Sequence, residues 1–172
     1  MKHSRRFLAG LLLPLVGCSS HPPLETVPSI DVPRFMGEWY VIAHIPTFIE
    51  DESHNAIEAY TLNEDGSVAV DFTFNDKSLD GPLKEYELTA FINEELNSKW
   101  QVQPFWPIKA DYRIVYLDEA YEQTVIARPS RDYVWIMARS PAIPEADYDK
   151  MVKYIDSIGY DTRDIRRVPH GK

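Results

Sequence analysis

Hydrophobic and polar residues alternate with a period of two along most of the chain, as in β-strands that bury one face. Val68, Val70, Phe72 and Phe74, for example, alternate with more polar neighbours. Eight strands are predicted, at residues 38–45, 56–62, 68–75, 85–92, 99–103, 112–116, 124–128 and 133–140. Most connections between them are short and rich in Asn, Asp, Gly and Pro, so successive strands should be antiparallel neighbours in an up-and-down meander.

One strong helix follows the strands. Pro144 suits the first turn, and Glu145 and Asp147 suit the positive end of the helix dipole. Tyr148, Met151, Val152, Ile155 and Ile158 form one apolar stripe at helical spacing, and Gly159 suits the position after the last turn. The strand at 133–140 is apolar on both faces, so we expect the helix to cover its outer face. A short strand-like piece is expected near 164–168.

Eight antiparallel strands avoid exposed edges by closing into a barrel, and such a barrel is wide enough for one small ligand. The fold class predicted is therefore all-β, an eight-stranded antiparallel up-and-down β-barrel with one C-terminal α-helix packed on its outside. The alternation turns many aromatic rings inward: Phe72, Phe74, Tyr86, Trp100, Tyr112, Tyr116 and Trp135. Periodicity alone leaves open whether these rings fill a solid core or line a pocket.

The first residues are typical of a lipoprotein leader. Lys2, Arg5 and Arg6 precede a short apolar run, and residues 1–17 together form a predicted signal peptide. The ending Leu15-Val16-Gly17-Cys18 resembles a bacterial lipobox, which implies that Cys18 becomes the acylated N-terminus. By resemblance to enterobacterial lipoproteins, Ser19 after it implies sorting to the outer membrane. We expect residues 18–30, which contain three prolines, to be a flexible tether, and residues 31–172 to be the barrel domain.

Charge and cysteine content exclude several functional classes. Removing the leader lowers the formal net charge from −9 to −12, because it takes away three basic residues and no acid. Such an acidic body is a poor match for nucleic acid, and anionic headgroups would repel it, so a lipid anchor would have to hold it at the membrane. A single cysteine excludes an intramolecular disulfide and a cysteine-rich zinc site.

Three motifs carry a family resemblance. Gly37-Glu38-Trp39 opens the first strand, residues 116–121 (Tyr-Leu-Asp-Glu-Ala-Tyr) lie at a late turn, and Arg139 ends the eighth strand. Their order and the C-terminal helix resemble the lipocalin family over about residues 31–169. The sequence around residues 103–112 and 132–136 is most similar to that of the bacterial outer-membrane lipocalins, which are relatives of apolipoprotein D and the plant lipocalins.

The resemblance implies a division of roles. Gly37, Trp39 and Arg139 are expected to close one end of the barrel, with the guanidinium stacked on the indole. The ligand expected is a fatty acid or lysophospholipid, bound for storage, transport or membrane maintenance by a protein anchored in the outer membrane and facing the periplasm. The candidate ligand-binding residues are those that the strand alternation turns into the barrel: Val70, Phe72, Tyr86, Leu88, Trp100, Tyr112, Ile114, Trp135 and Met137. Lys84, Lys109 and Arg113 are nearby cations for an anionic headgroup.

We expect neither catalysis nor a metal or cofactor. The five histidines lack metal-ligand spacing, the acids at 50–52 read as a solvated loop, and nucleophile-elbow and phosphate-loop motifs are missing from the sequence. An alternative hypothesis is a structural or assembly lipoprotein with a filled barrel that binds a protein partner. Apolar residues on the outer face, such as Ile42 and Phe91, could mark a homodimer contact.

Overall fold

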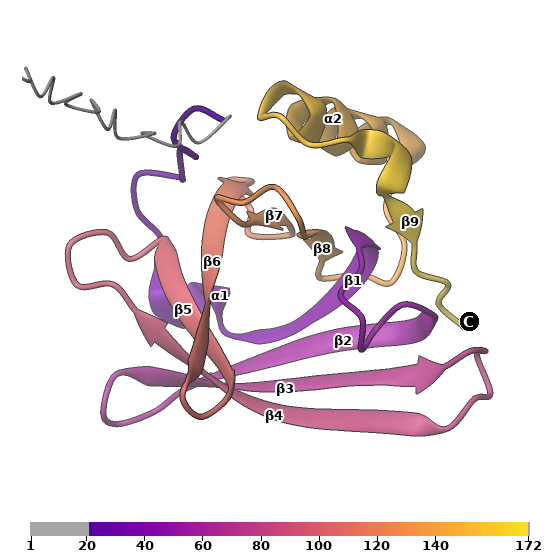
Figure 1. Ribbon diagram of the computed structural model, residues 1–172, viewed down its shortest axis with the longest axis horizontal. Coiled ribbons are helices and arrows are strands. Elements are labelled where there is room, and N and C mark those ends of the chain that lie inside the picture. The colour runs from indigo at the N-terminus through magenta and orange to yellow at the C-terminus, as the bar shows by residue number, and fades with distance from the viewer. Residues whose placement is uncertain (1–20, 172) are drawn as a thin grey trace, which may run out of the picture.

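Eight antiparallel strands close into a barrel because β1 pairs with both β8 and β2 (Figure 1). The computed structural model describes residues 21–171. The strands are β1 Gly37–Ile45, β2 Ser53–Leu62, β3 Ser67–Asp76, β4 Leu83–Ile92, β5 Lys99–Phe105, β6 Ile108–Leu117, β7 Gln123–Ala127 and β8 Val134–Ala138. Each strand pairs with its successor, which confirms the predicted meander.

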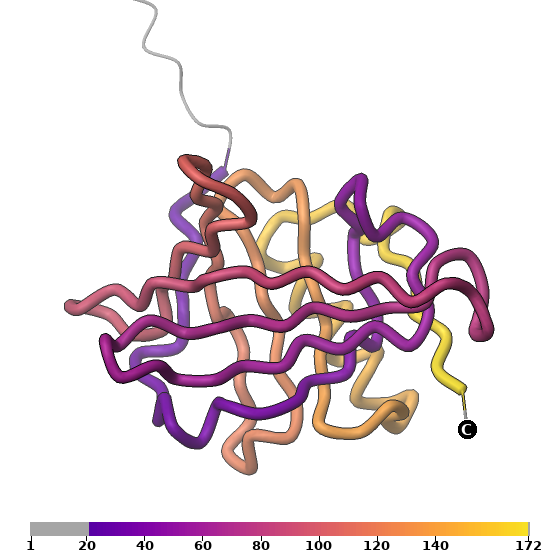
Figure 2. Tube along the Cα trace, turned by 90° about the horizontal axis from the view of Figure 1, so that it is seen from below, coloured from indigo at the N-terminus to yellow at the C-terminus, as the bar shows by residue number. Residues whose placement is uncertain are grey.

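The meander gives the barrel two different ends. A short helix, α1 (Val32–Phe35), lies at the end where β1 begins, together with the β2–β3, β4–β5 and β6–β7 connections. The other connections, β1–β2, β3–β4, β5–β6 and β7–β8, lie at the opposite end, and a hydrogen bond from Lys77 N to the Glu52 carbonyl joins the first two. The β1–β2, β5–β6 and β7–β8 connections are uppermost in Figure 2. We call the two ends the closed end and the open end, because an aromatic cluster fills the former and the cavity described below lies toward the latter.

The predicted helix is α2, Glu145–Ser157, and it lies on the outside of the barrel (Figure 1). Met151 and Ile155 pack on the outer faces of β1, β6, β7 and β8, where Val134 and Ile136 supply the outer side of the two-faced strand. Gly159 follows with a φ of +95°, which explains why glycine stands there. A 3₁₀ turn (η1, Thr162–Asp164) and the two-residue β9 (Arg166–Arg167) end the fold, and β9 pairs with β1.

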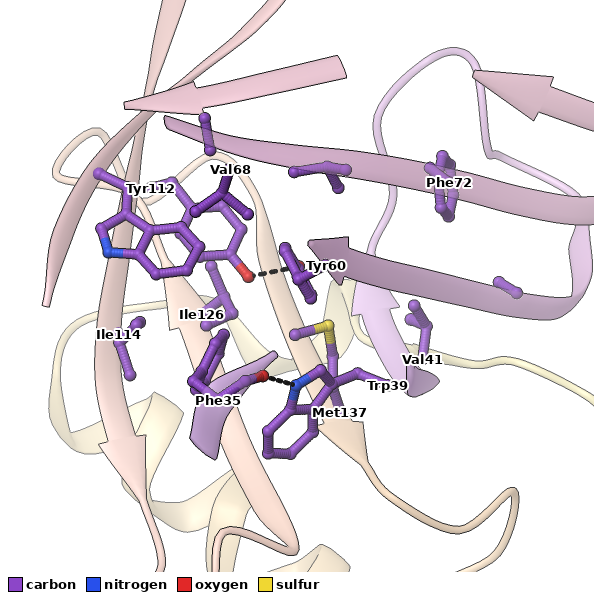
Figure 3. Close-up of a cluster of buried hydrophobic side chains, with 14 of the residues drawn as sticks. Phe35, Trp39, Val41, Tyr60, Val68, Phe72, Tyr112, Ile114, Ile126 and Met137 are labelled. Carbon is purple, nitrogen blue, oxygen red and sulfur yellow. Dashed lines mark hydrogen bonds between the residues drawn. The ribbon is translucent and has the colours of Figure 1, made fainter. Parts of the chain in front are cut away.

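The closed half of the barrel is filled by aromatic side chains (Figure 3). Phe35 contacts Trp39, Tyr60 and Trp100 with ring centroids 5.0–5.7 Å apart, and Trp100 stacks on Tyr112 at 5.6 Å. Trp39 and Trp100 are fully buried and satisfy their indole N–H groups with the carbonyls of Phe35 and Asn97. This half of the barrel is therefore a solid core.

The predicted inward position of Tyr116 is wrong. A register shift between Ile114 and Tyr116 in the β6–β7 pairing inserts a bulge, so the side-chain parity changes there. Ile114 faces the inner core, whereas Val115 and Tyr116 both belong to the outer cluster beneath α2. Tyr116 lies against Tyr154, with ring centroids 5.9 Å apart.

Residues 21–30, the described part of the expected flexible tether, lie against the barrel. They run along the outside of the barrel from the open end to the closed end (Figure 2). Arg131 Nη2 donates to the Pro22 carbonyl at 2.9 Å, Val27 N–H to the Ile114 carbonyl at 3.0 Å and Ile30 N–H to Asn97 Oδ1 at 2.9 Å. Ile30 is buried. Cys18 lies outside the described residues.

The two residues suggested for a homodimer contact are not exposed apolar positions. Ile42 is buried in the outer cluster, because β9 and α2 cover this side of β1. Phe91 is partly covered by Lys109, whose Nζ lies 3.7 Å from the ring centroid. These residues therefore do not support a homodimer.

Candidate ligand-binding site

Trp39 and Arg139 close the end of the barrel opposite the cavity. The Arg139 guanidinium carbon lies 3.8 Å from the centroid of the Trp39 ring, and the guanidinium donates to the carbonyls of Arg34, Phe35, Met36 and Glu38 at 2.7–3.1 Å. Gly37 adopts a φ of +91° beside it. The sequence motif thus ties α1 to the barrel wall through main-chain acceptors and a cation–π pair, an interaction of about 0.5–2 kcal/mol.

A cavity of about 150 Å³ lies between the aromatic core and the open end. Its wall is mostly apolar, with carboxyl, hydroxyl and guanidinium groups at a few positions. The lining residues are Thr47, Ile49, Glu50, Glu58, Val70, Phe72, Leu88, Val102, Pro104, Ala110, Asp111, Tyr112, Arg128 and Trp135. Its volume is below the roughly 300–1,000 Å³ of typical ligand pockets, so only part of a long ligand fits inside this conformation.

Nine residues were predicted to contact a ligand, and all nine belong to or pack against the inner core. Five of them line the cavity: Val70, Phe72, Leu88, Tyr112 and Trp135. The other four, Tyr86, Trp100, Ile114 and Met137, do not line it. Trp100, Ile114 and Met137 are fully buried in the core, while Tyr86 stacks on Phe74 at 6.0 Å.

A carboxyl group in the cavity wall was missed. Glu58 accepts a hydrogen bond from Tyr60 Oη, which also lies 2.7 Å from Tyr112 Oη (Figure 3 shows the tyrosine pair). Burial and the negative charge of Glu50 raise the pKa of the Glu58 carboxyl to about 8, so this group is largely protonated at neutral pH. Alternation with Ala56 and Tyr60 could have placed Glu58 inward, but glutamate is seldom found there.

Glu50 is a second acid in the cavity wall, and its burial corrects the expectation of a solvated side chain at this position, whereas Asp51 and Glu52 are exposed as expected. Glu50 is 3% exposed and accepts hydrogen bonds from Thr47 N at 3.1 Å and Trp135 Nε1 at 3.3 Å. His44 Nδ1 lies 3.4 Å from its Oε2 atom, and His44 is likewise buried. These contacts fix the β1–β2 connection across the top of the cavity.

Two polar atoms at the cavity wall lack a hydrogen-bond partner among residues 21–171. They are Arg128 Nε and Thr47 Oγ1, and both are buried. Lys84, Lys109 and Arg113, the cations considered for a headgroup, do not line the cavity, and Arg113 instead pairs with Asp111 at 2.5 Å. Arg128 is therefore the cation that the structure places at the cavity.

The described chain also shows what this site lacks. Residues 21–171 contain no group of three or more His, Cys, Asp or Glu side chains arranged to hold a metal ion. Across the same residues, no helix is both long and apolar enough to span a membrane.

Comparisons with known proteins agree with this architecture. A family model described as a lipocalin-like domain matches residues 30–170. The chain is 32% identical over 156 residues to temperature-induced lipocalin-1 of Arabidopsis thaliana, covering 85% of this chain and 82% of that protein. It is 28% identical over 152 residues to the outer membrane lipoprotein Blc of Escherichia coli K12, with 86% and 85% covered. Apolipoprotein D of Rattus norvegicus is 31% identical over 154 residues, with 80% and 77% covered.

Solved structures show the same fold at lower sequence identity. Insecticyanin from the tobacco hornworm Manduca sexta superimposes with a TM-score of 0.68 at 15% identity, covering 88% of this chain and 87% of that one. Members of the matched family are generally binding and transport proteins rather than enzymes. The family model, the relatives and the Trp39–Arg139 closure agree, and this chain belongs to the lipocalin family.

Proposed function

We propose that this lipocalin binds one acyl chain of a lysophospholipid or fatty acid in the open half of its barrel, for lipid storage, transport or membrane maintenance. The observation that carries the proposal is the apolar cavity above a solid core. A wall of Val70, Phe72 and Leu88 suits methylene groups, because their burial contributes roughly 0.8 kcal/mol per CH₂. The small volume favours one chain over two.

The polar groups at the cavity favour a zwitterionic headgroup over a bare carboxylate. Arg128 Nε and Thr47 Oγ1 offer unpaired donors for a phosphate, while the Arg128 Nη1 atom lies 3.3 Å from Asp132. Glu50, together with Asp111, which also pairs with Arg113, supplies carboxyl groups for an ammonium. A fatty acid would meet the same carboxyl groups with a like charge. Within the proposed class, we therefore expect a lysophospholipid such as lysophosphatidylethanolamine to bind more tightly than a fatty acid of equal chain length.

We further propose that acylation at Cys18 holds the domain in the outer membrane, with the barrel in the periplasm. The lipobox-like residues 15–18 support this proposal, and the relatives include proteins named outer membrane lipoprotein. Two or more acyl chains would anchor the domain stably, whereas one would bind marginally.

Calorimetric titration of residues 19–172 with lysophosphatidylethanolamine tests the ligand proposal. The contacts of both cores lie within residues 21–171, so this chain keeps them. We expect saturation near one equivalent, and Leu88→Trp, which fills the cavity, should weaken binding by at least about tenfold, equivalent to roughly 1.4 kcal/mol.

The matched control is Leu62→Trp, because Leu62 is 41% exposed at the opposite end of the barrel. This variant should bind as the wild type does, and circular dichroism verifies that both variants are folded. No heat of binding with delipidated, folded wild-type protein would overturn the proposal and favour a filled barrel that binds a protein partner.

A further inference from the structure

Large exposed apolar side chains gather on two connections at the open end. Phe48 in the β1–β2 connection is 89% exposed, and Trp106 in the β5–β6 connection is 83% exposed. Ile49, Phe105 and Ile108 beside them are also exposed. The two connections lie on the same upper side of the barrel in Figure 2. Loop tips are normally polar, so such tips mark an interaction surface.

The tips carry no charge, although charged residues make up 26% of the chain. Residues 45–49 read Ile-Pro-Thr-Phe-Ile, and residues 104–108 read Pro-Phe-Trp-Pro-Ile. Asp51, the first exposed acid after the former tip, pairs with Arg166 at 2.6 Å. Tryptophan and phenylalanine at the end of a short hairpin suit the boundary between lipid headgroups and acyl chains, where tryptophan is enriched.

The closed end has the opposite character. Its three strand connections contain seven acids and no basic residue: Glu64, Asp65, Glu94, Glu95, Asp118, Glu119 and Glu122. Anionic lipid would repel this end. The two ends of the barrel thus differ: one has apolar tips and connections with charges of both signs, and the other has connections with acids alone.

The start of the described chain lies at the same end as the apolar tips. Pro22 is held by Arg131 of the β7–β8 connection, and Cys18 precedes His21 by three residues. Three extended residues span at most about 11 Å, so an acyl group on Cys18 would enter the membrane close to the mouth of the barrel. An anchor at this place and apolar tips around the same mouth favour one orientation.

We infer that the open end docks on a phospholipid bilayer, with Phe48 and Trp106 inserted at the level of the headgroups and the cavity facing the membrane. This inference deepens the proposed function, because a mouth against the bilayer lets a single-chain lipid pass between membrane and cavity without crossing water. The occupant is the bilayer itself, and the tips bind it in addition to any anchor.

Vesicle sedimentation with unacylated protein, residues 19–172, tests the inference. The vesicles are made of two-chain phosphatidylcholine and phosphatidylethanolamine, so no single-chain ligand is supplied. We expect the wild type to sediment with them, and Phe48→Ser combined with Trp106→Ser to lower the partition coefficient by at least about tenfold. Brominated lipid should quench the fluorescence of Trp106 in the wild type, because the other three tryptophans are buried or half-buried in the barrel.

Leu62→Ser is the matched control, since it removes an exposed leucine from the acidic end and should leave sedimentation unchanged. Neither Phe48 nor Trp106 lines the cavity, so the double variant should keep the wild-type affinity for lysophospholipid. Equal sedimentation of wild type and double variant would overturn the inference, as would wild-type protein that stays in the supernatant. Self-association that the double variant abolishes, without vesicle binding, would assign the tips to a second copy of the chain. If the protein binds vesicles but shows no heat of binding with lysophospholipid, only the proposed function is contradicted.

Discussion

At the scale of single residues, polar side chains in the cavity wall distinguish this barrel from one with an entirely apolar cavity. Glu58 is half-buried in the cavity wall beside Tyr60, and Glu50 is buried beside His44 and Trp135. Burying a carboxyl group is unfavourable when it is ionised, and Glu58 avoids the penalty by remaining protonated. The charge of the cavity wall therefore changes with pH.

Glu58→Gln should make the protein more stable at pH 8 and leave its stability almost unchanged at pH 4.5. The folded state holds the Glu58 proton up to about pH 8, whereas the unfolded chain releases it near the ordinary value of 4.5. The unfolded state thus binds fewer protons between these values, and the free energy of unfolding falls as pH rises through this window. Glutamine keeps an acceptor for Tyr60 without the titration.

Urea denaturation across this pH range measures the effect. We expect the variant to gain on the order of 2 kcal/mol over the wild type at pH 8. Equal pH dependence of wild type and variant would contradict a Glu58 carboxyl group with a raised pKa.

The residues that could be predicted were those with a local signature. Trp39 and Arg139 follow from a short motif and its order, and Val70, Phe72 and Leu88 follow from alternation. Glu50 could not be predicted, because its burial depends on Trp135, which is 85 residues away in the sequence. Arg128 was missed for a similar reason: its Nε atom is buried by the fold and not by any neighbouring sequence pattern.

At the scale of elements, the strands and the helix were predictable because their patterns are long. The side of the barrel that each β6 side chain faces was not predictable, since one bulge near Val115 turns Tyr116 away from the inner core and toward α2. The contacts of residues 21–30 could not be predicted, because prolines at 22, 23 and 28 suggest a linker, while the hydrogen bonds of this segment run to distant Ile114 and Asn97. Long-range pairing of an irregular segment leaves no periodic signal.

Amide hydrogen exchange tests whether this segment belongs to the domain. The Val27 and Ile30 amides donate to acceptors on the barrel and should exchange at least about a hundredfold more slowly than in an unstructured peptide, as amides do when exchange requires local opening. Ser98→Ala removes the hydroxyl that donates to the Val27 carbonyl at 2.6 Å and should accelerate exchange at Val27. Exchange at the peptide rate in the wild type would restore the flexible tether.

At the scale of the whole molecule, the barrel divides into a closed half that provides stability and an open half that provides a cavity. The sequence left core and pocket as alternatives, and the structure contains both, one above the other. The division explains why only five of the nine predicted pocket residues line the cavity. It also places the mouth beside the apolar tips and the start of the described chain.

The most direct test of this division is a crystal structure with a lysophospholipid that carries bromine at the end of its acyl chain. Anomalous scattering locates the bromine independently of the surrounding density. The account predicts one bromine site inside the barrel, between Val70, Leu88 and Tyr112, with the headgroup toward Arg128. A bromine site outside the barrel, or a headgroup inside and the chain in solvent, would contradict it.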